Sequence, residues 1–270
     1  MDECCLRLAD KILALESRLC HALTGLKWDE HRISIVYNPL EYAHEPHANF
    51  LRKYTCDEES QRVVFLGMNP GPYGMVQTGV PFGEVAVVQE WLDIAGQVEI
   101  PARQHPARPV LGFASTRSEV SGRRFWSWIR RISDEDPSKF FRHCLVHNYC
   151  PLAFLDAKGK NITPPTLKAE ELRSLEGACD ASLVEYLQLI KPEIVVGVGK
   201  YATQRANVCR EVLKGEWSGR VVSLLHPSPA NPASNKPPGW EAQAQRQMAE
   251  AGVIPWMNPD LIEAAFAETS

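Results

Sequence analysis

Short, continuously apolar runs alternate with longer segments of helical periodicity along most of this chain. The runs are rich in β-branched residues, which is typical of parallel strands covered by helices on both faces. The predicted strands are 63–66, 144–147, 194–198 and 221–225, and the predicted helices that accompany them are 84–95, 121–132, 167–190, 200–213 and 240–251. This alternation predicts an α/β fold, a three-layer α/β/α sandwich with a central parallel four-stranded sheet.

An amphipathic helix is predicted at the start of the chain, because leucine and isoleucine recur at helical spacing from Leu6 to Leu23. We expect it to pack on the outside of the core, as a peripheral helical extension over residues 1–30. The chain has 270 residues and is 44% hydrophobic, enough for one substantial core. The sequence therefore predicts a single domain over 1–270.

Composition excludes several classes of protein. No apolar run approaches the roughly 20 residues that cross a bilayer, and Met1-Asp2-Glu3 lacks the basic region of a secretory signal. We expect an intracellular monomer without a membrane partner, in the nucleus of a eukaryote or in the cytoplasm and nucleoid of a bacterium. The 8 cysteines are scattered without a C-x-x-C pair, which predicts free, mostly buried thiols.

The charge pattern leaves a nucleic-acid partner open. A net charge of −4 argues against indiscriminate binding of polyanions, but a local basic groove depends on the distribution of charge rather than its total. Arginines gather in one short stretch, at Arg117, Arg123, Arg124, Arg130 and Arg131. They form either a solvated helix face or a track for phosphates.

Distinctive residues follow three of the predicted strands. These segments are GMNPGPYG at 67–74, HNYCP at 147–151 and HPSPANP at 226–232. In open parallel sheets, ligands bind beyond the carboxyl ends of the strands, and glycine with proline fixes an irregular backbone there. A fold has no structural need for Asn69, Asn148 and His226 on a common edge, so the sequence predicts a binding pocket.

The segments GMNPGPYGMVQTGVPFGE at 67–84 and HPSPANP at 226–232 resemble the two motifs of the single-strand-selective monofunctional uracil-DNA glycosylases. Residues 118–122, 124–126 and 147–151 are similar too, so the resemblance covers about 63–240. It implies the fold of the uracil-DNA glycosylase superfamily. It also implies that the protein removes uracil and some C5-oxidised uracils from single- or double-stranded DNA, leaves an abasic site for base excision repair, and uses no metal or cofactor.

The resemblance also assigns roles to single residues. Asn69 matches the asparagine that positions the attacking water, and His226 matches the histidine of the second motif. Phe82 matches the aromatic that stacks on the flipped base, and Asn148 matches the amide that reads it. The other predicted substrate-binding residues are Met68 and Gly71, the latter because glycine leaves room for a C5 substituent.

The segment after His226 resembles the wedge that fills the space left by a flipped base. Relatives often carry a larger basic residue where this chain has Ala230, which weakens the expected grip on duplex DNA. The predicted DNA contacts are Ser118, Ser228, Pro229, Ala230, Asn231, Pro232 and Lys236.

The residue types suit this chemistry. Breaking an N-glycosidic bond places negative charge on the departing uracil, so the catalyst must stabilise an anion and supply water. The amide of Asn69 cannot deprotonate water but can accept a hydrogen bond from it, and His226 can donate to uracil O2. Asn148 can satisfy N3–H and O4 of uracil, whereas cytosine presents the opposite polarity at N3 and C4. With no lysine in the predicted pocket to form a Schiff base, no lyase activity is expected.

Two other functions remain open. A metal-dependent hydrolase could use His143, Cys144, His147 and Cys150, although on a strand the two histidines would face one side and Cys144 the other. A non-catalytic module could bind single-stranded nucleic acid through the aromatic helix from Phe125 to Trp128. The helical periodicity favours these aromatics as core residues instead.

Overall fold

Four parallel strands form the centre of the computed structural model, which describes residues 7–55, 61–258 and 260. Their spatial order is β3 (Cys144–Asn148), β2 (Val63–Gly67), β6 (Ile194–Val198) and β7 (Arg220–Leu224). Every residue of β2, β3 and β6 is buried. The continuously apolar runs are therefore strands, and each predicted boundary is right to within one residue.

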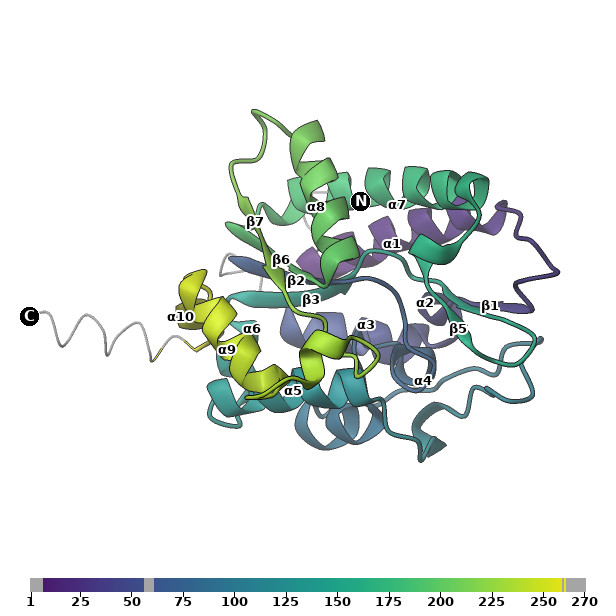
Figure 1. Cartoon of the computed structure of the whole chain (residues 1–270), viewed down its shortest axis with the longest axis horizontal. Helices are drawn as coiled ribbons and strands as arrows, with labels where there is room; N and C mark the ends of the chain where they lie inside the picture. Colours follow the sequence, from purple (N-terminus) through teal and green to yellow (C-terminus); the bar gives the residue numbers. More distant parts are fainter. Residues whose placement is uncertain (1–6, 56–60, 259, 261–270) are drawn as a thin grey trace, which may run out of the picture.

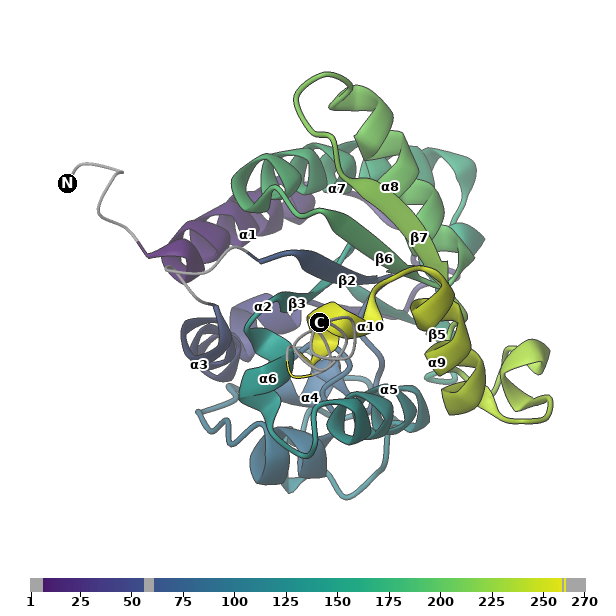
Figure 2. The same cartoon turned by 90° about the vertical axis from the view of Figure 1, so that its left-hand side faces the viewer.

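Helices cover both faces of this sheet, which confirms the predicted three-layer sandwich (Figures 1 and 2). On one face lie α1 (Leu8–Thr24), α7 (Ala169–Ile190) and α8 (Lys200–Val212). On the other lie α3 (His44–Tyr54), α5 (Val120–Ile132), α6 (Pro137–Phe141), α9 (Trp240–Glu250) and α10 (Ile254–Met257).

Helix α1 belongs to an outer layer but contributes one face to the main core. Ile12, Leu15, Leu19 and Leu23 are buried there at the helical spacing seen in the sequence. Glu16 lies on the same apolar face and is only 3% exposed. Removing its charge from water demands a partner inside the protein.

The aromatic residues of α5 are core residues. Phe125, Trp126 and Trp128 have no exposed surface, and Phe125 and Trp128 pack edge-on against Phe65 of β2. They are therefore not available as a surface on which bases could stack. This removes the main support for the non-catalytic nucleic-acid-binding alternative.

A small antiparallel sheet beside the main one was not predicted. It has the order β1 (Ile35–Tyr37), β4 (Ala153–Leu155) and β5 (Asn161–Ile162). Strands of two or three residues are too short to show an alternating pattern. The 11-residue helix α3 was also not predicted. The same holds for the short helices α6 and α10 and for α2 (Pro39–Tyr42), α4 (Met75–Thr78), η3 (Gly112–Ala114), η4 (Pro164–Thr166) and η5 (Pro232–Asn235).

The predicted helix over 84–95 is wrong in type and length. Its main part is the π-helix η2 (Val87–Trp91), and Asp93 then takes a left-handed conformation with φ of 48°. A non-glycine residue in that region does not continue a right-handed helix.

Two further predictions concern the cysteines and the lengths of the helices. Cys20, Cys144, Cys150, Cys179 and Cys209 are free and buried, as predicted, while Cys4, Cys5 and Cys56 lie outside the described residues. Within the described part of the chain, no helix is long and apolar enough to span a membrane.

Candidate active site

A cavity of about 170 Å³ lies beyond the carboxyl ends of the parallel strands. It brings together seven predicted residues: Met68, Asn69, Gly71, Phe82, Asn148, His226 and Ser228. The remaining lining residues are Pro72, Gly74, Met75, Glu119, Ser121, Gly122, Asn161 and Thr163. The segments after β2, β3 and β7 thus meet at one site, as the parallel arrangement requires.

Asn69 is held by the carbonyl group of Leu152. Its side-chain amide Nδ2 donates a hydrogen bond to Leu152 O over 3.1 Å. This contact fixes which end of the amide is the donor, because a carbonyl oxygen can only accept. The Oδ1 atom of Asn69 is therefore left to accept a hydrogen bond from a ligand or a water.

His226 is held as a neutral imidazole of defined tautomer. The backbone amide of Ser228 donates to Nδ1 over 3.1 Å, so Nδ1 carries no proton and the ring proton is on Nε2. Burial lowers the pKa of His226 to about 4. The ring can therefore offer an uncharged Nε2–H donor at neutral pH.

Asn148 lies at the end of β3, opposite Gly67 at the end of β2. Its Nδ2 donates to the sulfur of Met75 over 3.1 Å, and the residue is 7% exposed. A Cβ atom on Gly67 would lie 2.1 Å from Asn148 Oδ1 and 2.9 Å from the ring of Phe82. Only glycine at position 67 lets these two side chains share the cavity.

Phe82 has an unusual backbone conformation and a fixed ring. Its φ of 54° lies in the left-handed region, which is rare for a residue with a bulky side chain. Its ring stacks on Phe125 with centroids 4.4 Å apart and an interplanar angle of 23°. The half-buried ring is thus supported by the core on one side while it lines the cavity on the other. Strain of this kind is concentrated at functional sites.

Glu119 is a site residue for which no role was predicted from the sequence. Its Oε2 accepts a hydrogen bond from the backbone amide of Tyr73 over 3.3 Å, and burial raises its pKa. A Cβ atom on Gly71 would lie 2.6 Å from this oxygen. The absence of a side chain at Gly71 thus gives space to the Glu119 carboxyl group in the cavity wall.

Arg124 of α5 holds the loop that follows His226. It donates to Pro227 O over 3.0 Å, Ser234 Oγ over 3.3 Å and Asn235 Oδ1 over 3.1 Å. Pro229, Ala230 and Pro232 remain exposed on this loop, and Asn231 caps the short helix η5 (Pro232–Asn235). The predicted wedge is therefore a braced loop with a solvent-facing tip.

Two predicted DNA contacts, Ser118 and Lys236, lie outside the lining of the cavity and are exposed. The neighbouring arginines are engaged within the protein. Arg130 and Arg131 form ion pairs with Glu135 and Glu241, while Arg117 lies over the ring of Tyr73. The arginine stretch is therefore not one uniform phosphate track.

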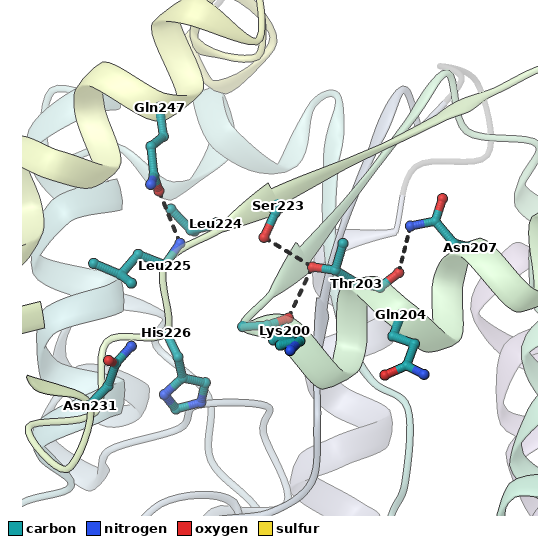
Figure 3. A pocket seen from close by; sticks show the side chains of 11 residues that line it. Lys200, Thr203, Gln204, Asn207, Ser223, Leu224, Leu225, His226, Asn231 and Gln247 are labelled. Carbon is teal, nitrogen blue, oxygen red and sulfur yellow. Dashed lines mark hydrogen bonds between the residues drawn. The ribbon is translucent and has the colours of Figure 1, made fainter. Parts of the chain in front are cut away.

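A second cavity of about 710 Å³ adjoins the first at His226. Figure 3 shows His226 and Asn231 on one side of it and Lys200 and Thr203 on the other. Most of the residues that line it have a polar side chain, among them Gln204, Asn207, Ser223 and Gln247. Lys200, at the first position of α8, is exposed there.

The four residues of the suggested metal site do not face one common centre. His143 packs edge-on against Trp256, and the thiol of Cys144 contacts Trp256 O. His147 instead stacks on Tyr186, and Cys150 contacts the backbone of Leu152. Within the described residues, no group of three histidine, cysteine, aspartate or glutamate side chains could hold a metal ion.

Comparisons with known proteins place this chain in one class. Residues 53–249 match the model of the uracil DNA glycosylase superfamily, and the chain belongs to that superfamily. The wild-type SMUG2 crystal structure from Pedobacter heparinus shares the fold, with a TM-score of 0.59, 20% identity and 98% of each chain covered.

Relatives narrow the assignment further. The single-strand selective monofunctional uracil DNA glycosylase of Bos taurus is 50% identical over 248 residues, which cover 92% of this chain and 88% of that protein. The protein of the same name from Rattus norvegicus is 46% identical, covering 96% of this chain and 91% of its own. The chain is thus a member of the single-strand selective monofunctional uracil-DNA glycosylase family, as its motifs predicted.

Proposed function

We propose that this protein hydrolyses the N-glycosidic bond of uracil in DNA and leaves an abasic site, the first step of base excision repair. It is a monofunctional uracil-DNA glycosylase by family membership. The observation that carries the residue roles is the geometry of the cavity, where Asn69, Phe82, Asn148 and His226 meet.

His226 stabilises the leaving group. As the glycosidic bond breaks, electrons move onto the uracil ring, and O2 gains negative charge. The Nε2–H of the neutral imidazole donates a hydrogen bond to that oxygen, and one such donor is worth about 10²–10³ in rate. The Ser228 amide on Nδ1 keeps this donor in place throughout the reaction.

Asn69 places the water. Its Oδ1 accepts a hydrogen bond from a water near C1′ of the sugar, while Leu152 O holds the other end of the amide. An amide is too weak a base to remove a proton, so the water adds to a sugar that already has cationic character. The water oxygen bonds to C1′, uracil leaves with the bonding electrons, and the water's proton is released to solvent.

Phe82 and Asn148 select the base. The Phe82 ring provides a stacking face worth about 1–3 kcal/mol. Asn148 accepts from uracil N3–H through Oδ1 and donates to O4 through the Nδ2 hydrogen that does not point to Met75. Met68, Gly71 and Glu119 line the same cavity, and the Glu119 carboxyl group takes the space that the sequence assigned to a C5 substituent beside Gly71. We still expect C5-oxidised uracils such as hydroxymethyluracil to be accepted in this cavity.

DNA follows the polar surface around the two cavities. The braced loop from Ser228 to Lys236 lies at the mouth, with Asn231 lining the second cavity. Lys200 lies on the opposite side of that cavity and contacts a phosphate of the same strand. Single-stranded and duplex DNA both present such phosphates, and the base is flipped into the cavity as in glycosylases generally.

A uracil-containing single-stranded oligonucleotide tests the proposal. We expect an alkali-sensitive abasic site, no strand break before alkali and no effect of a chelator. Strand cleavage by the enzyme itself would contradict monofunctional hydrolysis, because it requires an amine nucleophile, and among the described residues no lysine lines the smaller cavity, where the base is bound. Loss of activity with chelator would reinstate a metal-dependent reaction.

A further inference from the structure

Three buried ionisable side chains meet beside β3, at the edge of the parallel sheet and outside the cavity assigned to the base. Glu16 comes from α1, His47 from α3 and His147 from β3, and they are 3%, 2% and 8% exposed. Glu16 Oε2 lies 2.7 Å from His47 Nε2, and Glu16 Oε1 lies 3.5 Å from His147 Nδ1. None of the three lines the described cavity, and the proposed mechanism uses none of them.

The contacts of His47 define its charge. Nδ1 lies 2.8 Å from Gly79 O, and a carbonyl oxygen only accepts, so Nδ1 carries a proton. Nε2 faces the Glu16 carboxylate, which also accepts. Both nitrogens therefore donate, and the ring is an imidazolium ion paired with Glu16. Burial opposes this charge, but the carboxylate outweighs burial and raises the pKa of His47.

The network touches two of the segments that form the base cavity. Gly79 ends α4 in a left-handed conformation with φ of 72°, and Phe82 follows three residues later. A Cβ atom on Gly79 would lie 2.5 Å from Ala43 O. The backbone of Gly79 is therefore packed closely against Ala43, the residue that precedes α3. The second segment is β3, in which His147 immediately precedes Asn148. The His147 ring stacks on the ring of Tyr186, with centroids 4.3 Å apart.

We propose that the buried Glu16–His47–His147 cluster is a charged positioning device: it fixes the Gly79 carbonyl and the end of β3, and thereby sets the relative placement of Phe82 and Asn148. Without the imidazolium, Gly79 O loses a charge-assisted hydrogen bond, which is about twice as strong as a neutral one. The strained backbone at Phe82 then loses a nearby constraint. The inference rests on the base pocket of the proposed function.

The pH range in which the cluster is charged follows from the Glu16–His47 ion pair. The charge and hydrogen bond of His47 outweigh burial and lower the pKa of Glu16, with smaller effects of His147 and His44. The pair is thus intact above the lowered pKa of Glu16 and below the raised pKa of His47. Burial lowers the pKa of His147 to about 4, so that ring is neutral. The other titratable groups facing the cluster are Cys20 of α1 and Tyr186 of α7, whose burial raises their pKa values.

The test compares Glu16→Gln, which keeps the shape but removes the charge, with Glu16→Asp, which keeps the charge. Leu15→Ala is the matched control, because it removes part of a buried side chain from the same helix and leaves the charges of all three cluster residues in place. The measurement is kcat/KM for a uracil-containing single strand as a function of pH, at a temperature where all the proteins are folded.

For Glu16→Gln we expect kcat/KM to fall about tenfold or more, because small displacements of positioning groups are costly. We also expect the alkaline limb of the pH profile, the decline in kcat/KM at high pH, to shift to lower pH. Glu16→Asp should restore the wild-type limb, and Leu15→Ala should keep it. A Glu16→Gln profile that matches that of Leu15→Ala would overturn the inference. If the wild type released no uracil at all, the proposed function would fail instead.

A second measurement covers the case in which Glu16→Gln does not fold. In the wild-type protein, ¹⁵N chemical shifts of the His47 ring should change together with the Gly79 and Phe82 backbone signals as pH rises. A His47 ring that titrates while the Phe82 signals stay constant would overturn the inference.

Discussion

The side-chain amide of Asn69, a residue that lines the cavity, donates a hydrogen bond to the carbonyl oxygen of Leu152 over 3.1 Å, and its own oxygen is left as an acceptor. Replacing Asn69 with alanine removes the only group we assign to the water. We expect single-turnover excision to fall by orders of magnitude, with the affinity for uracil-containing DNA largely kept. Fluorescence anisotropy reports the affinity, and a parallel loss of binding would show that Asn69 holds DNA instead.

His226 should give a characteristic pH profile. Because burial lowers its pKa to about 4, excision should pass through about pH 6.5, the ordinary pKa of histidine, without an inflection. The rate should fall as the pH drops through the lowered pKa, because protonation of Nδ1 removes the acceptor for Ser228 N–H. His226→Leu should cost about 10²–10³ in rate at neutral pH. An inflection near the ordinary pKa that disappears in His226→Leu would contradict a neutral ring.

Gly67 provides a steric test of the base pocket. A Cβ atom there would lie 2.1 Å from Asn148 Oδ1, so Gly67→Ala should displace Asn148 and lower excision by about 10²-fold. The matched control is Gly177→Ala in α7, where a Cβ atom meets nothing within 4 Å. That change should raise the free energy of unfolding by about 0.5–1 kcal/mol, because alanine favours a helix interior. Equal effects of the two substitutions on excision would show that position 67 is not special.

Ala230 should limit the grip on duplex DNA. The loop around it is braced by Arg124, and its tip is exposed, so Ala230→Arg can add a cation without disturbing the bracing contacts. We expect tighter binding to duplex DNA and a salt dependence steeper by about one unit in log–log slope, as for one added phosphate contact. Affinity measured across a salt series checks this. An unchanged slope would show that residue 230 does not reach the backbone.

The sequence predicted those parts of the molecule that depend on local pattern. The strand that ends at Gly67 is apolar throughout, and Asn69 follows it in a stretch rich in glycine and proline. Because the carboxyl ends of parallel strands meet at one edge of the sheet, the sequence alone could place Asn69, Asn148 and His226 together. The tautomer of His226 could not, because it depends on the turn that brings the Ser228 amide to Nδ1.

Other residues lack a clear local signal. Glu119 precedes helix α5 and resembles an ordinary surface residue, and only the fold places it against Gly71. Glu16 did carry a faint signal, because it lies four residues after Ile12 on the apolar face of its helix. A charge at such a position indicates a buried partner, but His47 and His147 belong to other elements, and their approach is set by tertiary packing.

The strand order has a consequence for the newly synthesised chain. Asn69 follows the first strand of the parallel sheet to be made, while His226 follows the last, β7, at the far edge of that sheet. A ribosome-bound chain that has exposed residues only as far as the end of β3 can pair β2 with β3, yet it holds the water-positioning amide of Asn69 without His226, the donor to the leaving base. The active site is therefore complete only late in translation, after β7 has joined the parallel sheet.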